Sequence, residues 1–382
     1  MSRIHRRSQG TWEVVLEQGH DPRTGKRVRR TFTVRGTKKD AEREAAVQVS
    51  AQASGTYVDP SKETVGEFLE RWLRDYVEPS LALRTQLRYR DVVRNDLTPN
   101  LGNIPIQRLR PTHILAAEQA LRATGNRKTG GPLAPATVRK IHNVLHRALS
   151  HAVAWQSIPL NPADAVDRPS IPASTPRVLS PDQARTLLAA LDGHRFGLPL
   201  RTALLCGLRL SELLALRWAD IDWNGGRMLV LQSLDSRHDG AIRFKATKTH
   251  RSARPVSVPP QLLEALREHR ADQVRFRLMA GELWHDFDLV FANATGQPLT
   301  SGWIRKSFYR LLDDIGLPRL PLHGLRHTMA TLMLAAGEHP KVVSERLGHS
   351  NPSFTLTVYG HVVPGMHEGA SRRLEETLLP KA

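Results

Sequence analysis

Apolar residues recur with helical spacing through residues 64–168. The pattern predicts helices over 65–76, 80–97, 112–123 and 135–155. Pro79, the turn at 99–103 and the loop at 125–132 are expected to break these helices, because proline and glycine interrupt helical hydrogen bonding. We therefore expect an all-helical domain in this part of the chain.

The stretch before residue 60 has a different pattern. Two β-prone runs, 11–17 and 28–34, flank a turn-rich connector at 19–26, which predicts a hairpin. Thr37, followed three residues later by Asp40, has the form of an N-terminal capping pair and predicts a helix through 41–53. We expect a small module of sheet and helix.

A proline-rich stretch at 169–176 reads as a stiff linker before a third region. Ser180 and Gln183 form the pattern of a capping box around Pro181, and a helix over 198–217 is expected to carry Arg209. Strands are predicted over 228–234, 241–246 and 255–258, and a helix is expected to run from Pro340 to Gly348. The predicted fold class is multidomain and mainly α, with small β-sheets and a mixed α+β third domain.

Net charge indicates the class of partner. The 382 residues include 55 Lys and Arg against 37 Asp and Glu, giving a formal charge of +18 and a pI near 10.8. Such an excess of positive charge favours a polyanionic binding partner, and nucleic acid is the leading candidate. A merely soluble basic protein and a protein that binds anionic membranes remain as alternatives, although no long apolar span or lipidation motif supports a membrane.

The single cysteine, Cys206, lies in an apolar run and reads as a buried small residue. One cysteine excludes an internal disulfide, and the N-terminus lacks the apolar stretch of a secretory signal. Both features predict a cytoplasmic location.

Basic residues near the N-terminus are candidates for DNA contact, because a β-ribbon can enter a DNA groove. No carboxylate interrupts the set, which comprises Arg23, Lys26, Arg27, Arg29, Arg30, Arg35, Lys38 and Lys39. The alternative is a solvated edge strand protected from aggregation by its charge. In the helical region, the loop residues Arg127 and Lys128 are candidates for contact with backbone phosphates.

The last half of the chain holds residues suited to attack on a phosphodiester. Arginine and histidine donors stabilise charge on non-bridging oxygens, and a hydroxyl-bearing side chain supplies the nucleophile. In chain order the candidates are Arg209, Lys248, His323, Arg326, His349 and Tyr359. Converging carboxylates to hold Mg²⁺ are lacking, so we expect no metal and disfavour a metal nuclease or transposase.

Short motifs around these residues resemble those of one family. Residues 207–218 (GLRLSELLALRW) resemble the first arginine box of the tyrosine recombinases, the phage-integrase family. Residues 323–328 (HGLRHT) resemble its His-x-x-Arg box, and 347–350 (LGHS) followed by Tyr359 resemble its closing histidine and nucleophile. Each motif alone is weak evidence for this family, but the four motifs in the family's order are specific evidence for the resemblance.

The resemblance implies a role for each residue. Tyr359 would attack phosphorus to form a 3′-phosphotyrosyl link and release a 5′-hydroxyl, without ATP or any other cofactor. Arg209 and Arg326 would hold non-bridging oxygens, and His349 would donate another hydrogen bond. His323 would accept the tyrosine proton, Lys248 would protonate the leaving oxygen, and Glu212 would orient Arg209. Lys245 competes with Lys248 for the lysine role.

The resemblance also implies a domain plan. Residues 36–42 (GTKKDAE) are similar to the arm-binding module of phage and conjugative-element integrases, so 1–60 would be an arm-type DNA-binding domain with a three-stranded sheet plus a helix. Residues 64–168 would form a SAM-like core-binding domain, 177–365 the catalytic domain and 366–382 a C-terminal tail.

The implied function is site-specific integration, with excision, of a phage or mobile element. The implied partners are double-stranded DNA with core-type and arm-type sites, further copies of the chain in a synaptic homotetramer, a host DNA-bending protein and a directionality factor. The implied location is the bacterial nucleoid. A type IB topoisomerase-like enzyme and a non-catalytic DNA-binding regulator are the alternative functions.

Overall fold

The structure is a computed structural model that describes residues 2–20, 24–53, 57–172, 177–235, 241–246, 253–348, 375 and 378. The chain divides into two compact units, Met1–Ala173 and Ser174–Ala382. The division falls inside the proline-rich stretch 169–176. Within the ranges above, no helix is both long enough and apolar enough to cross a membrane.

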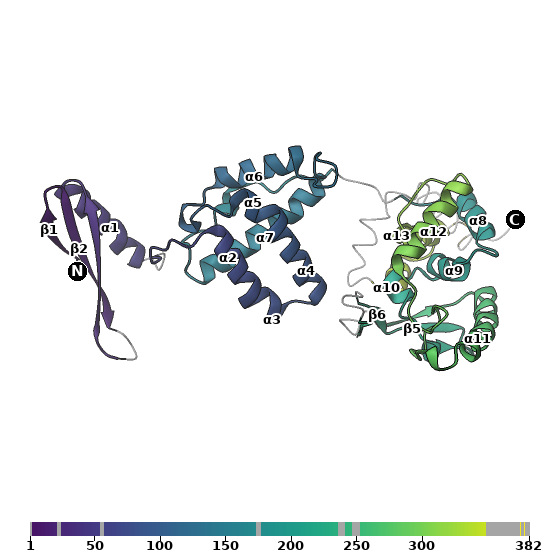
Figure 1. The fold of residues 1–382 in the computed structure, drawn as a ribbon. Helices are drawn as coiled ribbons and strands as arrows, with labels where there is room; N and C mark the ends of the chain where they lie inside the picture. The colour runs from purple at the N-terminus through teal and green to yellow at the C-terminus, as the bar shows by residue number, and fades with distance from the viewer. Residues whose placement is uncertain are drawn as a thin grey trace. The chain divides into compact units, whose positions relative to one another are not determined.

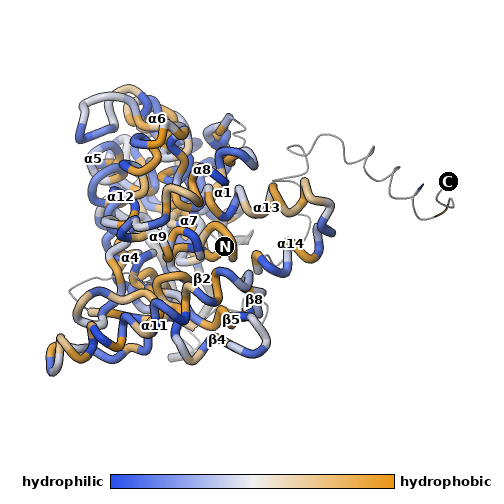
Figure 2. The backbone as a smooth tube through the Cα atoms, turned by 90° about the vertical axis from the view of Figure 1, so that its right-hand side faces the viewer, coloured by the Kyte–Doolittle hydropathy of each residue, from blue (hydrophilic) through white to orange (hydrophobic). Residues whose placement is uncertain are grey.

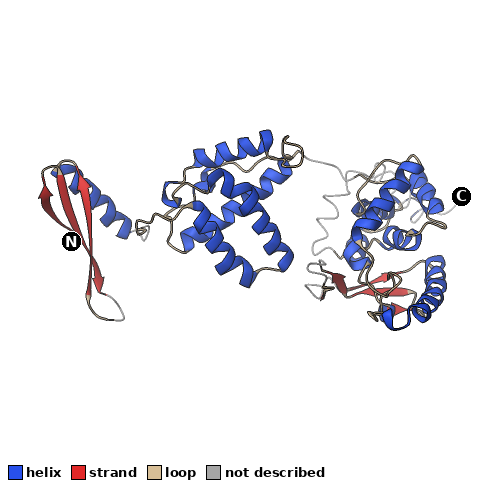
Figure 3. Ribbon diagram, viewed as in Figure 1, coloured by secondary structure: helices blue, strands red, loops and turns tan. Residues whose placement is uncertain are grey.

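The first unit begins with an antiparallel sheet packed on a helix (Figures 1 and 3). The strands, in the spatial order β1-β2-β3, are β1 (Ser2–Ser8), β2 (Thr11–His20) and β3 (Arg27–Arg35), and the helix is α1 (Lys38–Ala53). Val14 and Leu16 of β2 are buried together with Ala41 and Ala45 of α1. The predicted hairpin is the β2–β3 pair, and the sheet has β1 as its third strand.

The predicted capping pair starts α1. The backbone N–H of Thr37 donates to Asp40 Oδ2 at 2.8 Å, and the Asp40 N–H donates to Thr37 Oγ1 at 3.3 Å. This exchange satisfies N–H groups that a helix start would otherwise leave without partners.

The rest of the first unit is a helical bundle around one apolar core. Its helices are α2 (Val65–Trp72), α3 (Glu78–Ser80), α4 (Leu83–Val92), α5 (Thr98–Leu101), α6 (Pro111–Thr124) and α7 (Pro135–Ala154). Phe68 and Trp72 of α2 are fully buried with Leu149 of α7. Along these helices, hydrophobic stretches alternate with hydrophilic ones, as expected when one face packs on a core (Figure 2).

The expected helix breaks at the prolines are wrong in detail. A π-helical turn at Leu73–Val77 joins α2 to α3, and a second at Val93–Leu97 joins α4 to α5. Pro79 and Pro99 each lie two residues after such a turn. Proline lacks an N–H and its ring collides with the carbonyl four residues earlier, so a wider turn lets the helix continue where a regular one would break.

The second unit combines helices with two small antiparallel sheets (Figure 3). One sheet has the order β4-β5-β8 and the other pairs β6 with β7; the strands are β4 (Ile221–Asp222), β5 (Arg227–Val230), β6 (Gln232–Leu234), β7 (Phe244–Ala246) and β8 (Arg254–Ser257). The helices are α8 (Pro181–Ala190), α9 (Gly197–Cys206), α10 (Leu210–Leu213), α11 (Pro260–Ala280), α12 (Ser301–Asp314), α13 (His323–Ala335) and α14 (Pro340–Leu347). Met228 and Val256, paired across β5 and β8, belong to the same core as Phe308 of α12.

The predicted single helix over 198–217 is wrong. It is two helices, because α9 ends at Gly207 in the left-handed region, with a φ of 65°. The backbone angle favours glycine here, and a Cβ on Gly207 would also lie 1.9 Å from Met329 Cε, so the end of that α13 side chain would have to move. The break places Arg209 in a turn instead of on a helix face.

Candidate active site

Arg209 is presented by the turn between α9 and α10. Its backbone is extended, with φ −68° and ψ 146°, and it occupies the N-cap of α10. The backbone N–H and the guanidinium Nη1 donate to the Glu212 carboxylate at 3.0 and 2.6 Å. The side chain is 39% exposed, so the guanidinium is both held in place and accessible to a ligand.

Glu212 lies between two guanidinium groups and is only 5% exposed. Besides Arg209, it accepts hydrogen bonds from Arg254 Nη2 at 2.8 Å and Nη1 at 3.3 Å. Burial alone would raise the pKa of this carboxyl, but the hydrogen bonds and charges of Arg254 and Arg209 outweigh burial and lower the pKa to about 2. Glu212 is therefore ionised at neutral pH.

Two buried arginines hold the C-terminal end of α14. Arg326, 1% exposed on the first turn of α13, donates from Nη1 to the Gly207 carbonyl at 2.8 Å and from Nη2 to the Leu347 carbonyl. Arg254 Nε donates to the Arg346 carbonyl at 2.7 Å. The last carbonyls of a helix carry partial negative charge, which suits these cations. The turn before Arg209 and the end of α14 are thereby tied together.

His323 is the first residue of α13, three positions before Arg326. Its ring meets that of His327 edge-on, with centroids 4.6 Å apart. Partial desolvation, followed by the charges of His327, Arg326 and Arg209, lowers the pKa of His323 to about 4. His323 is therefore neutral at neutral pH, the form that can accept a proton.

Three predicted catalytic residues, Lys248, His349 and Tyr359, lie outside the described residues. The helix expected to lead to His349 is α14, and Gly348 ends it with a φ of 66°, as predicted. The competing Lys245 lies on β7, paired with Ser233 of β6.

The predicted DNA-binding residues are on the surface where the structure describes their side chains. Lys26, with Arg27, Arg29 and Arg35 of β3, is exposed, as are Lys38 and Lys39 at the start of α1. Arg23 and the Arg30 side chain lie outside the described part of the structure. In the bundle, Arg127 is exposed with its Nη2 3.9 Å from Asp96 Oδ1, and the Lys128 backbone N–H donates to Asn126 Oδ1 at 3.1 Å.

The sequence prediction missed Arg254. The alternation of side chains along β8 could have revealed it. In the structure Arg254 and Val256 are buried, while Pro255 and Ser257 are exposed. An arginine in phase with the apolar residues of a strand points into the core, where it needs a buried acceptor.

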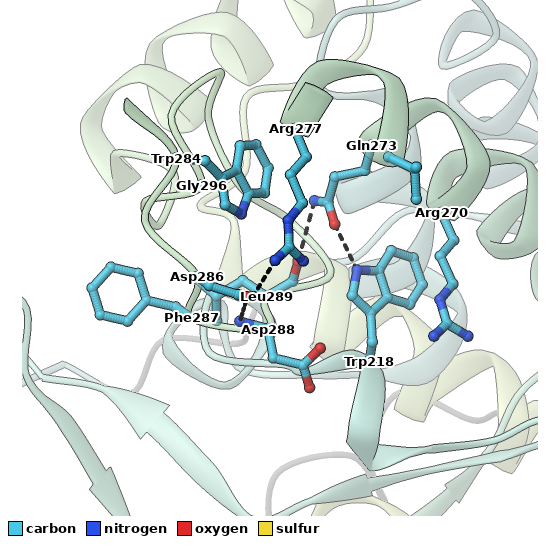
Figure 4. Close-up of a pocket in the computed structure, with 11 residues that line it drawn as sticks. Trp218, Arg270, Gln273, Arg277, Trp284, Asp286, Phe287, Asp288, Leu289 and Gly296 are labelled. Atoms are coloured by element: carbon cyan, nitrogen blue, oxygen red, sulfur yellow. Dashed lines mark hydrogen bonds and ion pairs between the residues drawn. The ribbon is translucent and has the colours of Figure 1, made fainter. Parts of the chain in front are cut away.

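A separate pocket of about 140 Å³ lies beside α11 (Figure 4). Gln273 accepts a hydrogen bond from Trp218 Nε1 at 2.6 Å, and Arg277 Nη2 lies 2.9 Å from Asp286 Oδ2. Of the predicted catalytic residues that the structure describes, none lines this pocket. Across the described ranges, His, Cys, Asp and Glu form no group of three or more that could hold a metal ion.

Comparison with protein families matches both units. A model described as the phage integrase family matches residues 177–365, and a model of the phage integrase N-terminal SAM-like domain matches residues 64–121. An integrase of Mycobacterium phage L5 is 30% identical over 298 residues, covering 77% of this chain and 74% of that protein. A tyrosine recombinase XerC-like protein of Caldanaerobacter subterraneus subsp. tengcongensis is 27% identical over 391 residues, covering 96% of each chain.

Solved structures share the fold. A fragment of the Tn1549 transposon integrase, in complex with a circular intermediate DNA, matches with a TM-score of 0.67 at 21% identity, covering 82% of this chain and 99% of that chain. A lambda integrase tetramer bound to a Holliday junction matches with a TM-score of 0.55 at 19% identity, covering 91% and 96%.

Proposed function

The chain belongs to the phage integrase family of tyrosine recombinases, enzymes of DNA strand exchange, and from this we propose that it cuts and rejoins DNA through a 3′-phosphotyrosyl link on Tyr359. One observation carries the proposal. Arg209 is far in sequence from His323 and Arg326, yet the three come together where α9, α10 and α13 meet, with Arg209 accessible and His323 neutral.

In the first step the Tyr359 oxygen attacks phosphorus and the bond to the 5′ oxygen breaks. His323 accepts the phenol proton, which matters because free tyrosine has a pKa of about 10 and so is neutral at neutral pH. Lys248 gives a proton to the leaving oxygen. The 5′-hydroxyl of a partner strand then attacks the phosphotyrosyl link and restores the tyrosine, so no external energy source is consumed.

The arginines stabilise the charge on the non-bridging oxygens. Arg209 supplies an accessible guanidinium held by ionised Glu212, and Arg326 lies beside the turn that carries Arg209, through its bond to the Gly207 carbonyl. His349 follows the end of α14 and donates a further hydrogen bond to the same phosphate. Donors fixed before the substrate arrives need little reorganisation during reaction, which is the basis of their catalytic effect.

The domain roles extend the proposal. Residues 64–168 and 177–365 would bind the core-type site, and 1–60 would bind arm-type sites through the exposed cations of β3 and α1. The Tn1549 and lambda integrase structures contain DNA, and one is a tetramer on a Holliday junction, which supports a tetrameric synapse. The tail 366–382 would dock on a neighbouring copy of the chain. Integration and excision of a phage or mobile element in the bacterial nucleoid, aided by a bending protein and a directionality factor, would be the biological outcome.

Covalent trapping tests the function without knowledge of the site. Wild type and Tyr359→Phe are expressed beside the native element, bound DNA is stripped with denaturant, and the DNA that remains attached is sequenced. Tyr309→Phe is the matched control, because it removes a phenol from α12 of the same unit.

We expect adducts at one locus for wild type and Tyr309→Phe, and none for Tyr359→Phe. Adducts scattered along the chromosome would instead indicate a topoisomerase-like enzyme. DNA occupancy without any adduct would indicate a non-catalytic regulator.

A further inference from the structure

We propose that Arg254, to which the family motifs above assign no role, is a positioning residue that couples Arg209 to the segment leading into His349. The inference rests on the proposed function, since it concerns the same phosphate site. Arg254 does not reach the reacting atoms; it acts through Glu212 on one side and through the end of α14 on the other.

One buried guanidinium joins three segments distant in sequence. Arg254 begins β8 and is 5% exposed. It donates through Nη2 to Glu212 Oε2 at 2.8 Å, and Glu212 in turn holds the guanidinium of Arg209 at 2.6 Å. Its Nε donates to the Arg346 carbonyl at 2.7 Å. A displacement of β8 would therefore shift both the guanidinium of Arg209 and the C-terminal end of α14.

The chain also passes close over Arg254 just before His349. A Cβ on Gly348 would lie 2.9 Å from Arg254 Cδ and 3.0 Å from Nη1, closer than side chains ordinarily approach. The left-handed turn at Gly348 therefore lies directly against the guanidinium group. That turn sets the direction in which the chain leaves α14.

Lysine cannot reproduce this arrangement. A guanidinium is a planar fork whose Nε and Nη groups can serve two acceptors in fixed directions, whereas an ammonium is a point charge on a flexible stem. Arg254→Lys keeps the positive charge that ionised Glu212 requires but cannot hold both Glu212 and the Arg346 carbonyl in the same geometry. The substitution therefore tests whether Arg254 is needed for its geometry, because its charge is kept.

The experiment measures single-turnover cleavage on the crossover duplex recovered from wild-type adducts, at saturating protein, alongside the dissociation constant and the melting temperature. Arg217→Lys is the matched control, since Arg217 also grips a buried carboxylate, Asp220, through two nitrogens at 2.9 and 2.8 Å. We expect Arg254→Lys to slow cleavage by the folded protein about a hundredfold, as a small misplacement of catalytic groups does, with unchanged DNA affinity. Arg217→Lys should cleave at the wild-type rate.

A second comparison covers the case in which Arg254→Lys does not fold. Arg254→Met combined with Glu212→Gln removes both charges of the buried pair, a replacement that cores often tolerate. The double variant should cleave about tenfold more slowly than Glu212→Gln alone, because the hold on α14 is also lost. Equal rates for this pair, or a wild-type rate for Arg254→Lys, would overturn the role of Arg254. Absence of adducts from the wild-type protein would instead overturn the proposed function itself.

Discussion

On strand β3 the side chains of Arg27, Arg29 and Arg35 are exposed, whereas Arg254 and Arg326 in the second unit are buried and donate to named acceptors. Arginine is thus found in two physical environments in this protein, water and the protein core. In water the charge of an exposed arginine is screened beyond roughly 10 Å, and its position is loosely defined. In the core, a guanidinium must satisfy its donors and so fixes the groups around it.

The difference indicates a division of work. Exposed cations suit attraction to the phosphate backbone, which needs charge but little geometry. Cations that are buried, or that a buried partner holds as Glu212 holds Arg209, suit the chemical step, which needs fixed donors and tolerates little displacement. Three substitutions test this division, beginning with the largest expected effect.

Removal of the Glu212 charge should destabilise the second unit most. Glu212→Gln leaves the buried Arg254 guanidinium without its counter-charge, and breaking a buried pair in this way costs about 3–5 kcal/mol in the free energy of unfolding. Denaturant unfolding measures the loss. The control is Glu264→Gln, because Glu264 is exposed and its pair with Arg267 is a surface contact.

The same carboxyl predicts the acid stability. Its pKa is about 2 in the folded chain against 4.5 for the unperturbed group, so its contribution is fully present above pH 4.5 and is lost as the pH falls toward 2. Glu212→Gln should flatten the stability profile in that window. A wild-type profile with no decline between pH 4.5 and 2 would show that Glu212 is not held as an ion in the fold.

Loss of the accessible arginine should affect chemistry and leave stability nearly unchanged. Arg209→Ala removes a donor aimed at the phosphate, and loss of one such donor slows reaction about 100- to 1,000-fold. Single-turnover cleavage and DNA affinity are to be compared with those of Arg275→Ala, an exposed ion-paired arginine on α11. If a fall in DNA affinity accounts for the whole loss of rate, Arg209 acts like the exposed cations of β3, by attracting DNA and not by stabilising the reacting phosphate.

Removal of one positive charge from β3 should have the smallest effect of the three substitutions, and that effect should be on DNA affinity. Arg29→Ala is expected to weaken DNA binding by less than about tenfold and to reduce the slope of log affinity against log salt by about 0.9, the value for one phosphate contact. Arg29→Lys keeps the charge and serves as the control at the same position. If Arg29→Lys is as weak as Arg29→Ala, the residue contributes geometry and the contrast between the two regions fails.

Local patterns in the sequence determined much of this protein. Apolar periodicity predicted α6 and α7 to within a residue or two, and the capping residues Thr37 and Ser180 stand at the starts of α1 and α8. Ordered motifs indicated the family, and the family model that covers 177–365 bears this out. Such features depend on neighbours a few residues apart, which a single sequence displays directly.

The tertiary structure decided what depends on distant neighbours. Helical spacing runs unbroken through Gly207 in the sequence, but in the fold the left-handed backbone at Gly207 ends α9, and Arg209 becomes the N-cap of α10. The π-helical turns before Pro79 and Pro99 likewise let the helices continue past residues that locally favour a break. Arg254 gained its role from Glu212 and Arg346, 42 and 92 positions away, because a buried guanidinium selects its acceptors by proximity in the folded chain.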